Sequence, residues 1–109
     1  MMRTKLIVAL VFACLPILAA AKGNVEAGAK KAETCKACHG EGGAKPTLPE
    51  YPVLAGQHAD YLAAALSQYK SGKRKNALMA GFSAALSVQD INDLAAYFAA
   101  QKSDLKNKY

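Results

Sequence analysis

The chain of 109 residues is poor in cysteine, with only Cys14, Cys35 and Cys38. Cys14 falls in an apolar N-terminal stretch, so the remainder keeps a single pair separated by two residues. A disulfide between Cys35 and Cys38 would close a very short loop and would stabilise the fold little. The sequence therefore excludes a small domain held by several disulfides. A chain this short buries little apolar surface, so its fold usually needs another stabilising element such as a bound cofactor.

Internal repeats, low-complexity tracts and linkers are also missing, and no alternating apolar pattern typical of strands is present. The formal net charge is +6, and the densest basic run is Lys70, Lys73, Arg74 and Lys75. No aromatic residue interleaves with this run, which disfavours nucleic acid as a partner. The run is either solvated surface or a patch that attracts an acidic protein by electrostatic steering.

The apolar stretch near the N-terminus, residues 6–18, is shorter than the about 20 apolar residues that a membrane-spanning helix needs. Arg3 and Lys5 precede it and small residues follow it, so residues 1–21 are predicted to be a secretory signal peptide. An uncleaved N-terminal anchor is the alternative. We expect one exported domain, residues 22–109, in a periplasm of the Gram-negative type and without stable membrane insertion once the signal is removed.

The segment Cys35-Lys36-Ala37-Cys38-His39 has the C-x-x-C-H spacing of covalent c-type haem attachment. Positions i, i+3 and i+4 share one face of a helical turn, so both thiols and the imidazole can approach one porphyrin. The thiols would become thioethers, and His39 would bind the iron from the proximal side. Chance, a thiol redox site or half of a zinc site are the alternatives. The missing disulfides favour haem, since a bound macrocycle supplies the apolar surface that the core lacks.

Helical spacing of apolar residues runs through the exported part. Asn24 is a predicted N-cap for a first helix that reaches about Cys35, and Gly28 within it indicates either close approach of another helix or a neutral surface position. A helix is expected over 59–71, ended by Gly72, and its apolar stripe consists of Leu62, Ala65, Leu66 and Tyr69. The last helix is expected from Ser87, with Asp90 completing a capping box. Two irregular stretches, 40–52 and 73–85, separate the helices. Long loops in a small domain need a reason, and wrapping both sides of a haem is one.

Elimination leaves two candidate residues for the second axial ligand of the haem iron. Met79 is the one methionine outside the predicted signal peptide, and His58 is the one histidine besides His39. Met79 is flanked by apolar residues that could seal a haem edge, whereas His58 stands at a polar helix entrance. We expect Met79 to be the ligand, with a bis-His site at His58 as the alternative. A lone methionine can also be core filler.

Pro52 is a candidate acceptor for the free ring N–H of His39, because iron-bound histidines usually donate to a fixed acceptor. From the residues alone it could equally be an ordinary turn proline.

Taken together, the chain resembles a class I c-type cytochrome. The resemblance rests on the attachment motif with its following Gly40, the P-x-L-x-G segment at Pro52–Gly56, Met79 in the expected distal loop, and a C-terminal helix with Tyr97 and Phe98. It implies an all-α cytochrome c fold, with three main helices and two long loops around one covalent haem. It also implies that the Pro52 carbonyl accepts from His39, and that Gly28 meets Tyr97 or Phe98.

The resemblance is strongest to one half of the bacterial periplasmic dihaem cytochromes, but a single C-x-x-C-H implies one haem c per chain. Cys35, Cys38, His39 and Met79 would bind the cofactor, with His39 and Met79 on the metal. The implied function is electron transfer between a respiratory donor and acceptor, with redox proteins as partners and no small-molecule substrate or enzymatic activity. Alternatives are an electron-relay subunit of a larger dehydrogenase or reductase, a gas sensor in which Met79 leaves, and a thiol oxidoreductase, which lacks its expected βαβ context.

Overall fold

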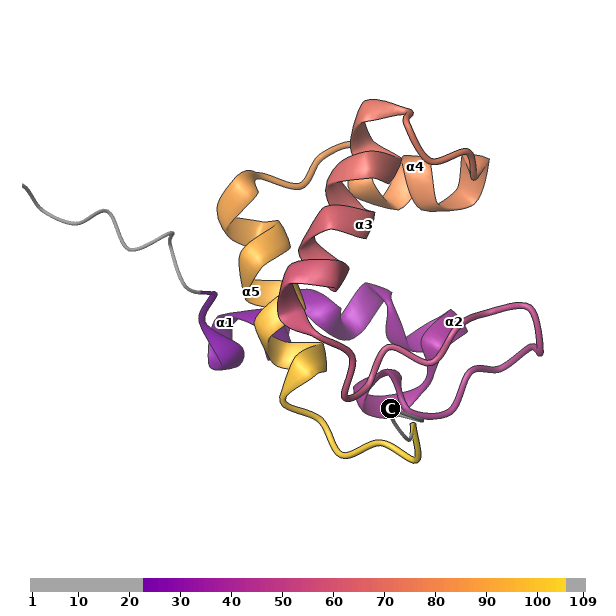
Figure 1. Ribbon diagram of the computed structural model, residues 1–109, viewed down its shortest axis with the longest axis vertical. Helices are drawn as coiled ribbons and strands as arrows, with labels where there is room; N and C mark the ends of the chain where they lie inside the picture. Colours follow the sequence, from indigo (N-terminus) through magenta and orange to yellow (C-terminus); the bar gives the residue numbers. More distant parts are fainter. Residues whose placement is uncertain (1–22, 106–109) are drawn as a thin grey trace, which may run out of the picture.

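The computed structural model describes residues 23–105, and all regular structure in this range is helical (Figure 1). The predicted signal peptide, residues 1–21, lies outside the described residues. No helix between residues 23 and 105 is both long enough and apolar enough to cross a bilayer. The elements in order are α1 (Val25–Lys31), the 3-10 turn η1 (Ala32–Thr34), α2 (Lys36–His39), the 3-10 turn η2 (Glu41–Gly43), α3 (Ala59–Ser71), α4 (Ala77–Ser83) and α5 (Val88–Ala99).

The predicted helix ends are confirmed where local capping chemistry sets them. The Asn24 side chain accepts from the Ala27 amide at 2.9 Å and starts α1. Ser87 and Asp90 form the expected reciprocal capping box at the start of α5. Gly72 ends α3 in a left-handed conformation with φ of 83°. The expected first helix tightens into a 3-10 turn after Lys31 before it reaches the attachment motif.

The expectation of irregular structure over 73–85 is wrong for its central part, because α4 occupies Ala77–Ser83. Asn76 starts this helix, and its side chain accepts from the Met79 amide at 3.0 Å. Gly81 lies in the helix interior, where glycine costs only about 1 kcal/mol relative to alanine, and the packing of α4 against α3 offsets this cost. Met79 therefore lies on a helix and not in a loop.

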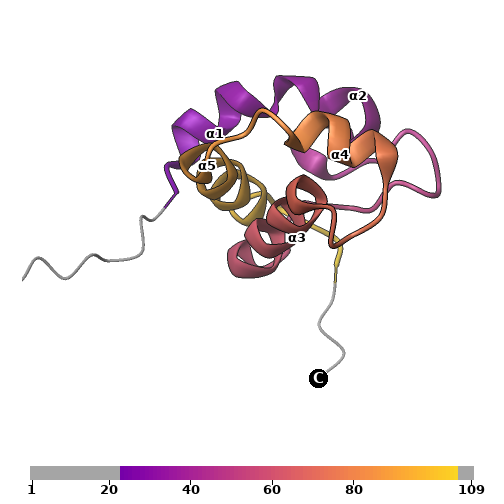
Figure 2. The same ribbon diagram turned by 90° about the horizontal axis from the view of Figure 1, so that it is seen from above.

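α5 packs against both α1 and α3, as the two orthogonal views show (Figure 1, Figure 2). Gly28 makes the contact with α1 close: a β-carbon there would lie 2.0 Å from the Asp93 carbonyl oxygen and 2.7 Å from the Tyr97 β-carbon. Close approach is thus confirmed over a neutral surface position, and Tyr97 is the aromatic neighbour. The buried core beneath these helices consists of Ala32, Leu62, Leu94, Ala95 and Phe98.

A buried carboxylate joins α1 to α5. Asp93, only 3% exposed, accepts from the Asn24 backbone amide at 2.7 Å, from Lys31 Nζ at 2.6 Å and from Gln89 Nε2 at 2.7 Å. These hydrogen bonds, the Asn24 amide first, lower the pKa of Asp93 to about 2. Lys31 also pairs with Asp90 at 2.8 Å. Since α1 leads directly into the attachment motif, this network holds the motif against the core.

Candidate cofactor site

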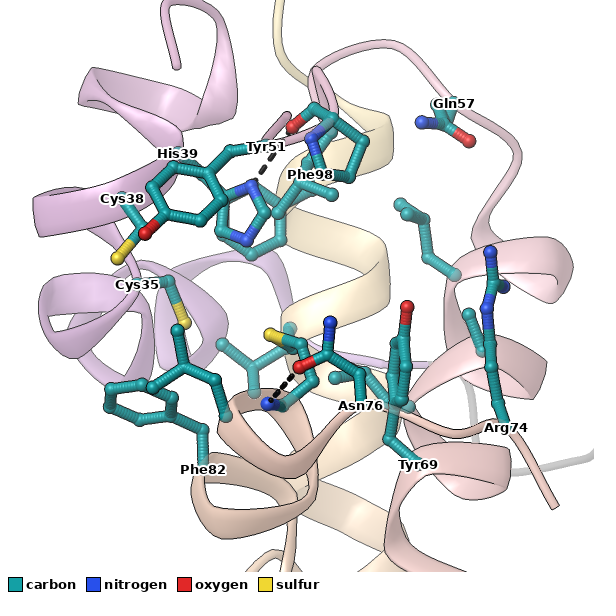
Figure 3. Close-up of a pocket in the computed structure, with 18 of the residues that line it drawn as sticks. Cys35, Cys38, His39, Tyr51, Gln57, Tyr69, Arg74, Asn76, Phe82 and Phe98 are labelled. Atoms are coloured by element: carbon teal, nitrogen blue, oxygen red, sulfur yellow. Dashed lines mark hydrogen bonds between the residues drawn. The ribbon is translucent and has the colours of Figure 1, made fainter. Parts of the chain in front are cut away.

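A cavity of about 390 Å³ lies between α2, α3, α4 and α5 (Figure 3). Its size is within the range of cofactor and ligand pockets. All four residues predicted to bind the cofactor line it: Cys35, Cys38, His39 and Met79. Most of the remaining lining is apolar or aromatic, including Leu54, Leu62, Leu66, Leu78, Phe82, Leu94 and Phe98. The predicted apolar stripe of α3 therefore faces this cavity as well as the core.

The attachment motif forms the helical turn that its spacing predicts. Cys35 is the N-cap of α2, and the His39 amide donates to the Cys35 carbonyl at 3.0 Å. Cys35 and Cys38 are both free thiols and half-buried. Because positions i, i+3 and i+4 of this turn share a face, two thiols and one imidazole reach the same cavity wall.

His39 is buried, and the Nδ1 atom of its ring lies 2.9 Å from the Pro52 carbonyl oxygen. A carbonyl oxygen can only accept, so Nδ1 carries the proton and donates. The lone pair of the neutral ring then resides on Nε2, the nitrogen available to a metal. The candidate role of Pro52 is confirmed: it is the acceptor that fixes the ring.

Burial raises the pKa of the Cys35 thiol, although a hydrogen bond with Thr34 opposes this effect. A redox-active C-x-x-C site depends on a cysteine with a lowered pKa, which makes the thiolate available at neutral pH. The Cys35 environment acts in the opposite direction. The Cys35 environment therefore gives no support to the thiol-oxidoreductase alternative.

The opposite wall of the cavity comes from α4. Asn76 and Phe82, which lie on either side of Met79 in sequence, are across the cavity from His39 (Figure 3). Met79 itself is half-buried and lines the cavity. His58 is exposed at the N-cap of α3 and does not line the cavity. The structure therefore brings Met79, and not His58, to the same cavity as His39.

Sequence reasoning missed a polar end of this cavity, made of Gln57, Tyr61, Tyr69 and Arg74. Arg74 Nη1 donates to the Tyr61 hydroxyl at 3.3 Å, and the guanidinium lies 5.1 Å from the centroid of the Tyr69 ring. Tyr69 belongs to the predicted stripe of α3, so the sequence signals its position. The sequence shows Arg74 only as part of a basic run, because its direction depends on the turn at Gly72.

Comparison with known proteins agrees with this geometry. A sequence model described as "Cytochrome c" matches residues 25–102. The chain belongs to the cytochrome c family. Cytochrome c4 from Pseudomonas aeruginosa is 48% identical over 85 residues, a match that covers 78% of this chain and 42% of that protein. Cytochrome c-554(548) from Halomonas halodenitrificans is 43% identical over 83 residues, covering 73% of this chain and 99% of the relative.

The solved structure of reduced cytochrome c4 from Pseudomonas stutzeri superposes with a TM-score of 0.70 at 39% identity, over 76% of this chain and 48% of that one. The all-α cytochrome c fold expected from the sequence is confirmed. This chain spans about half the length of the cytochrome c4 relatives, as expected for a match to one half of a longer cytochrome.

Haem c is the cofactor of this family, and the cavity fits one such group. Its lining is largely apolar, two free thiols share one wall, and the Pro52 hydrogen bond leaves His39 Nε2 as the nitrogen that can bind metal. One attachment motif provides for one haem per cytochrome chain. Within residues 23–105, no three His, Cys, Asp or Glu side chains are grouped to hold a metal ion together, so the zinc alternative gains no support.

Proposed function

We propose that this cytochrome is a periplasmic one-electron carrier that moves electrons between redox-protein partners. The observation that carries the proposal is that His39 from α2 and Met79 from α4 line the same cavity, which also holds both thiols of the attachment motif. Two protein ligands leave no open coordination position for a substrate. We therefore propose that the protein is not an enzyme in its own right, and that residues 1–21 direct its export.

Each residue has a separate task in this proposal. Cys35 and Cys38 hold the cofactor as thioethers, which prevents its loss in dilute solution. His39 binds the iron, and the Pro52 carbonyl fixes the ring and its tautomer. Met79 would supply a neutral thioether as the second ligand, and such a ligand raises the reduction potential relative to two histidines. When bound, haem c supplies an Fe(II)/Fe(III) couple.

A test of the ligand set compares Met79→Ala with His58→Ala in holoprotein purified from cells that attach haem. Acidified organic solvent should leave the colour on the wild-type protein, because the attachment is covalent. The oxidised wild type should show the long-wavelength sulfur–iron charge-transfer band, and Met79→Ala should lose it entirely. His58→Ala is the matched control and should keep it.

Two results would contradict the proposal. Survival of the band in Met79→Ala would remove Met79 from the ligand set. A change in the spectrum of the reduced wild type on addition of carbon monoxide would indicate an exchangeable position and would favour a gas sensor over a carrier.

A second candidate function is an electron-relay subunit of a larger oxidoreductase. It is favoured by a protein from Thiomonas intermedia named "Thiosulfate dehydrogenase electron acceptor", 39% identical over 76% of this chain and 38% of that protein. The solved thiosulfate dehydrogenase TsdBA from Marichromatium purpuratum also matches, with a TM-score of 0.69 over 20% of its chain. Gel filtration of native periplasmic extract decides between the two: elution with a catalytic subunit indicates the relay, and elution at the size of the chain alone indicates the carrier.

A further inference from the structure

The polar end of the cavity was defined above by Gln57, Tyr61, Tyr69 and Arg74. Gln57, Tyr69 and Arg74 lie on the far side of the cavity from the two cysteines (Figure 3), and Tyr61 is hydrogen-bonded to Arg74. Thioether attachment fixes the vinyl-derived edge of a haem at Cys35 and Cys38. The two propionates leave the macrocycle from the other half of its rim. Their carboxylates would therefore be met at the polar end, where Arg74 is the one lysine or arginine between residues 23 and 105 that lines the cavity.

Arg74 is held against α3 in three ways. Its backbone amide donates to the Gln68 carbonyl at 3.1 Å, its Nη1 donates to the Tyr61 hydroxyl, and its guanidinium lies over the Tyr69 ring. None of the ion pairs within residues 23–105 includes Arg74. A guanidinium has five donors in a planar fork that matches carboxylates, and one neutral tyrosine uses only one of them. The side chain is thus oriented in advance and retains donors for an anion.

The same short segment also holds the distal ligand. Asn76, two residues after Arg74, lines the cavity and caps α4 by accepting from the backbone amide of Met79 itself. α4 is only two turns long, so its position depends on this cap and on the connection to α3. Any movement of Arg74 away from α3 would be passed through Lys75 to Asn76 and then to Met79.

We propose that Arg74 is a positioning residue that binds the haem propionates and, through segment 74–76, keeps Met79 in place as the distal ligand. The inference rests on the ligand set of the proposed function. Its two parts are separable: contact with the carboxylates acts on the reduction potential, and attachment to α3 acts on how firmly Met79 stays bound. Lys73 and Lys75, the two neighbours of Arg74, are exposed as Arg74 is but do not line the cavity, so they supply charge controls matched in exposure.

The experiment uses wild-type holoprotein and the variants Arg74→Gln, Arg74→Lys, Lys73→Gln and Lys75→Gln. For each, the reduction potential and the temperature at which the oxidised protein loses the sulfur–iron band are measured. A cation near the propionates stabilises the reduced state, so Arg74→Gln should shift the equilibrium towards the oxidised state by about tenfold, or about 59 mV for a one-electron couple. The two lysine variants remove the same charge from side chains that do not line the cavity, so water and salt screen that charge from the cofactor and the equilibrium should shift far less.

Arg74→Gln should also lose the band at a lower temperature than either lysine variant. Arg74→Lys keeps the positive charge but lacks the planar guanidinium and its contact with the Tyr69 ring. Its reduction potential should therefore be close to that of the wild type, whereas it should still lose the sulfur–iron band at a lower temperature than the wild type. The inference is overturned if Arg74→Gln matches Lys73→Gln in both measurements. Wild-type behaviour of Arg74→Lys in the band measurement would overturn the part that concerns Met79.

These outcomes are distinct from failure of the proposed function. If the wild type lacks the sulfur–iron band, Met79 is not a ligand, and the part of the inference that concerns the positioning of Met79 fails with the proposed function. The reduction potentials of the Arg74 variants would still test whether Arg74 contacts the propionate carboxylates. If Arg74→Gln does not accumulate as holoprotein, Tyr61→Phe takes its place, because it removes only the hydroxyl to which Arg74 donates. Early loss of the band is expected, and an unchanged temperature would count against the inference.

Discussion

Replacing Gly28 with alanine should destabilise the cytochrome, although alanine is the better helix former. A helix-interior glycine costs about 0.5–1 kcal/mol relative to alanine, so propensity alone predicts a gain. The added β-carbon, however, would lie 2.0 Å from the Asp93 carbonyl oxygen and 2.7 Å from the Tyr97 β-carbon. Both neighbours are rigid parts of α5, and no rotation of a flexible side chain can relieve the contacts.

The size of the effect follows from these two opposing contributions. Overpacking typically costs about 1–3 kcal/mol, and we expect the upper end because the obstacle is backbone. Subtracting the gain in propensity leaves a loss of about 2 kcal/mol in the free energy of unfolding. For a domain of this size, that loss lowers the melting temperature by roughly 8–16 °C.

Gly81→Ala is the matched control, because Gly81 is also in a helix interior but a β-carbon added there would meet no heavy atom of a neighbouring element within 4 Å. It should stabilise the protein by about 0.5–1 kcal/mol. Thermal and denaturant unfolding of both holoproteins, followed by helical circular dichroism, measures the difference. Equal or greater stability of Gly28→Ala would refute the close contact between α1 and α5, and destabilisation by Gly81→Ala would refute the open space around α4.

Two further predictions concern acid stability and the cap of α4. The pKa of Asp93 is lowered from 3.8 to about 2 in the folded protein, so this carboxylate stabilises the fold above pH 3.8 and the contribution is lost as the pH falls from about 3.8 to about 2. Asp93→Asn should flatten this part of the acid unfolding curve, measured by circular dichroism, and an unchanged slope would count against the prediction. Asn76→Ala removes the cap of α4, which is worth about 1 kcal/mol. It should lower the temperature at which the sulfur–iron band disappears more than that of global unfolding, and parallel shifts would contradict a local effect.

Several features could be predicted because they depend on residues close together in sequence. The Asn24 cap, the Ser87–Asp90 capping box and the end of α3 at Gly72 each involve at most one helical turn. The attachment turn is equally local, since His39 follows Cys35 by one turn and its amide hydrogen bond closes that turn.

The features that could not be predicted depend on how distant segments pack in the folded protein and not on the local pattern of residues. Gly81 indicates a loop by its residue type, but glycine costs a helix only about 1 kcal/mol, and the packing of α4 against α3 that offsets this cost is not visible in the sequence. Arg74 belongs by pattern to a charged surface, because the sequence does not show which way the chain turns after Gly72. Its placement between Tyr61 and Tyr69 results from that turn and from the packing of the segment on α3.

By itself, the sequence determined the chemistry of this cytochrome: two thiols and an imidazole within one helical turn, one methionine outside the predicted signal peptide, and helices with their own caps. Only the tertiary structure decided that Gly28 lies against α5, that the Pro52 carbonyl reaches His39, and that Arg74 faces the cofactor cavity. The physical reason is that hydrogen bonding within a turn is set by neighbouring residues. Contacts between residues distant in sequence exist only once separate segments have packed together: α1 on α5, the loop at Pro52 on α2, and the segment after Gly72 on α3.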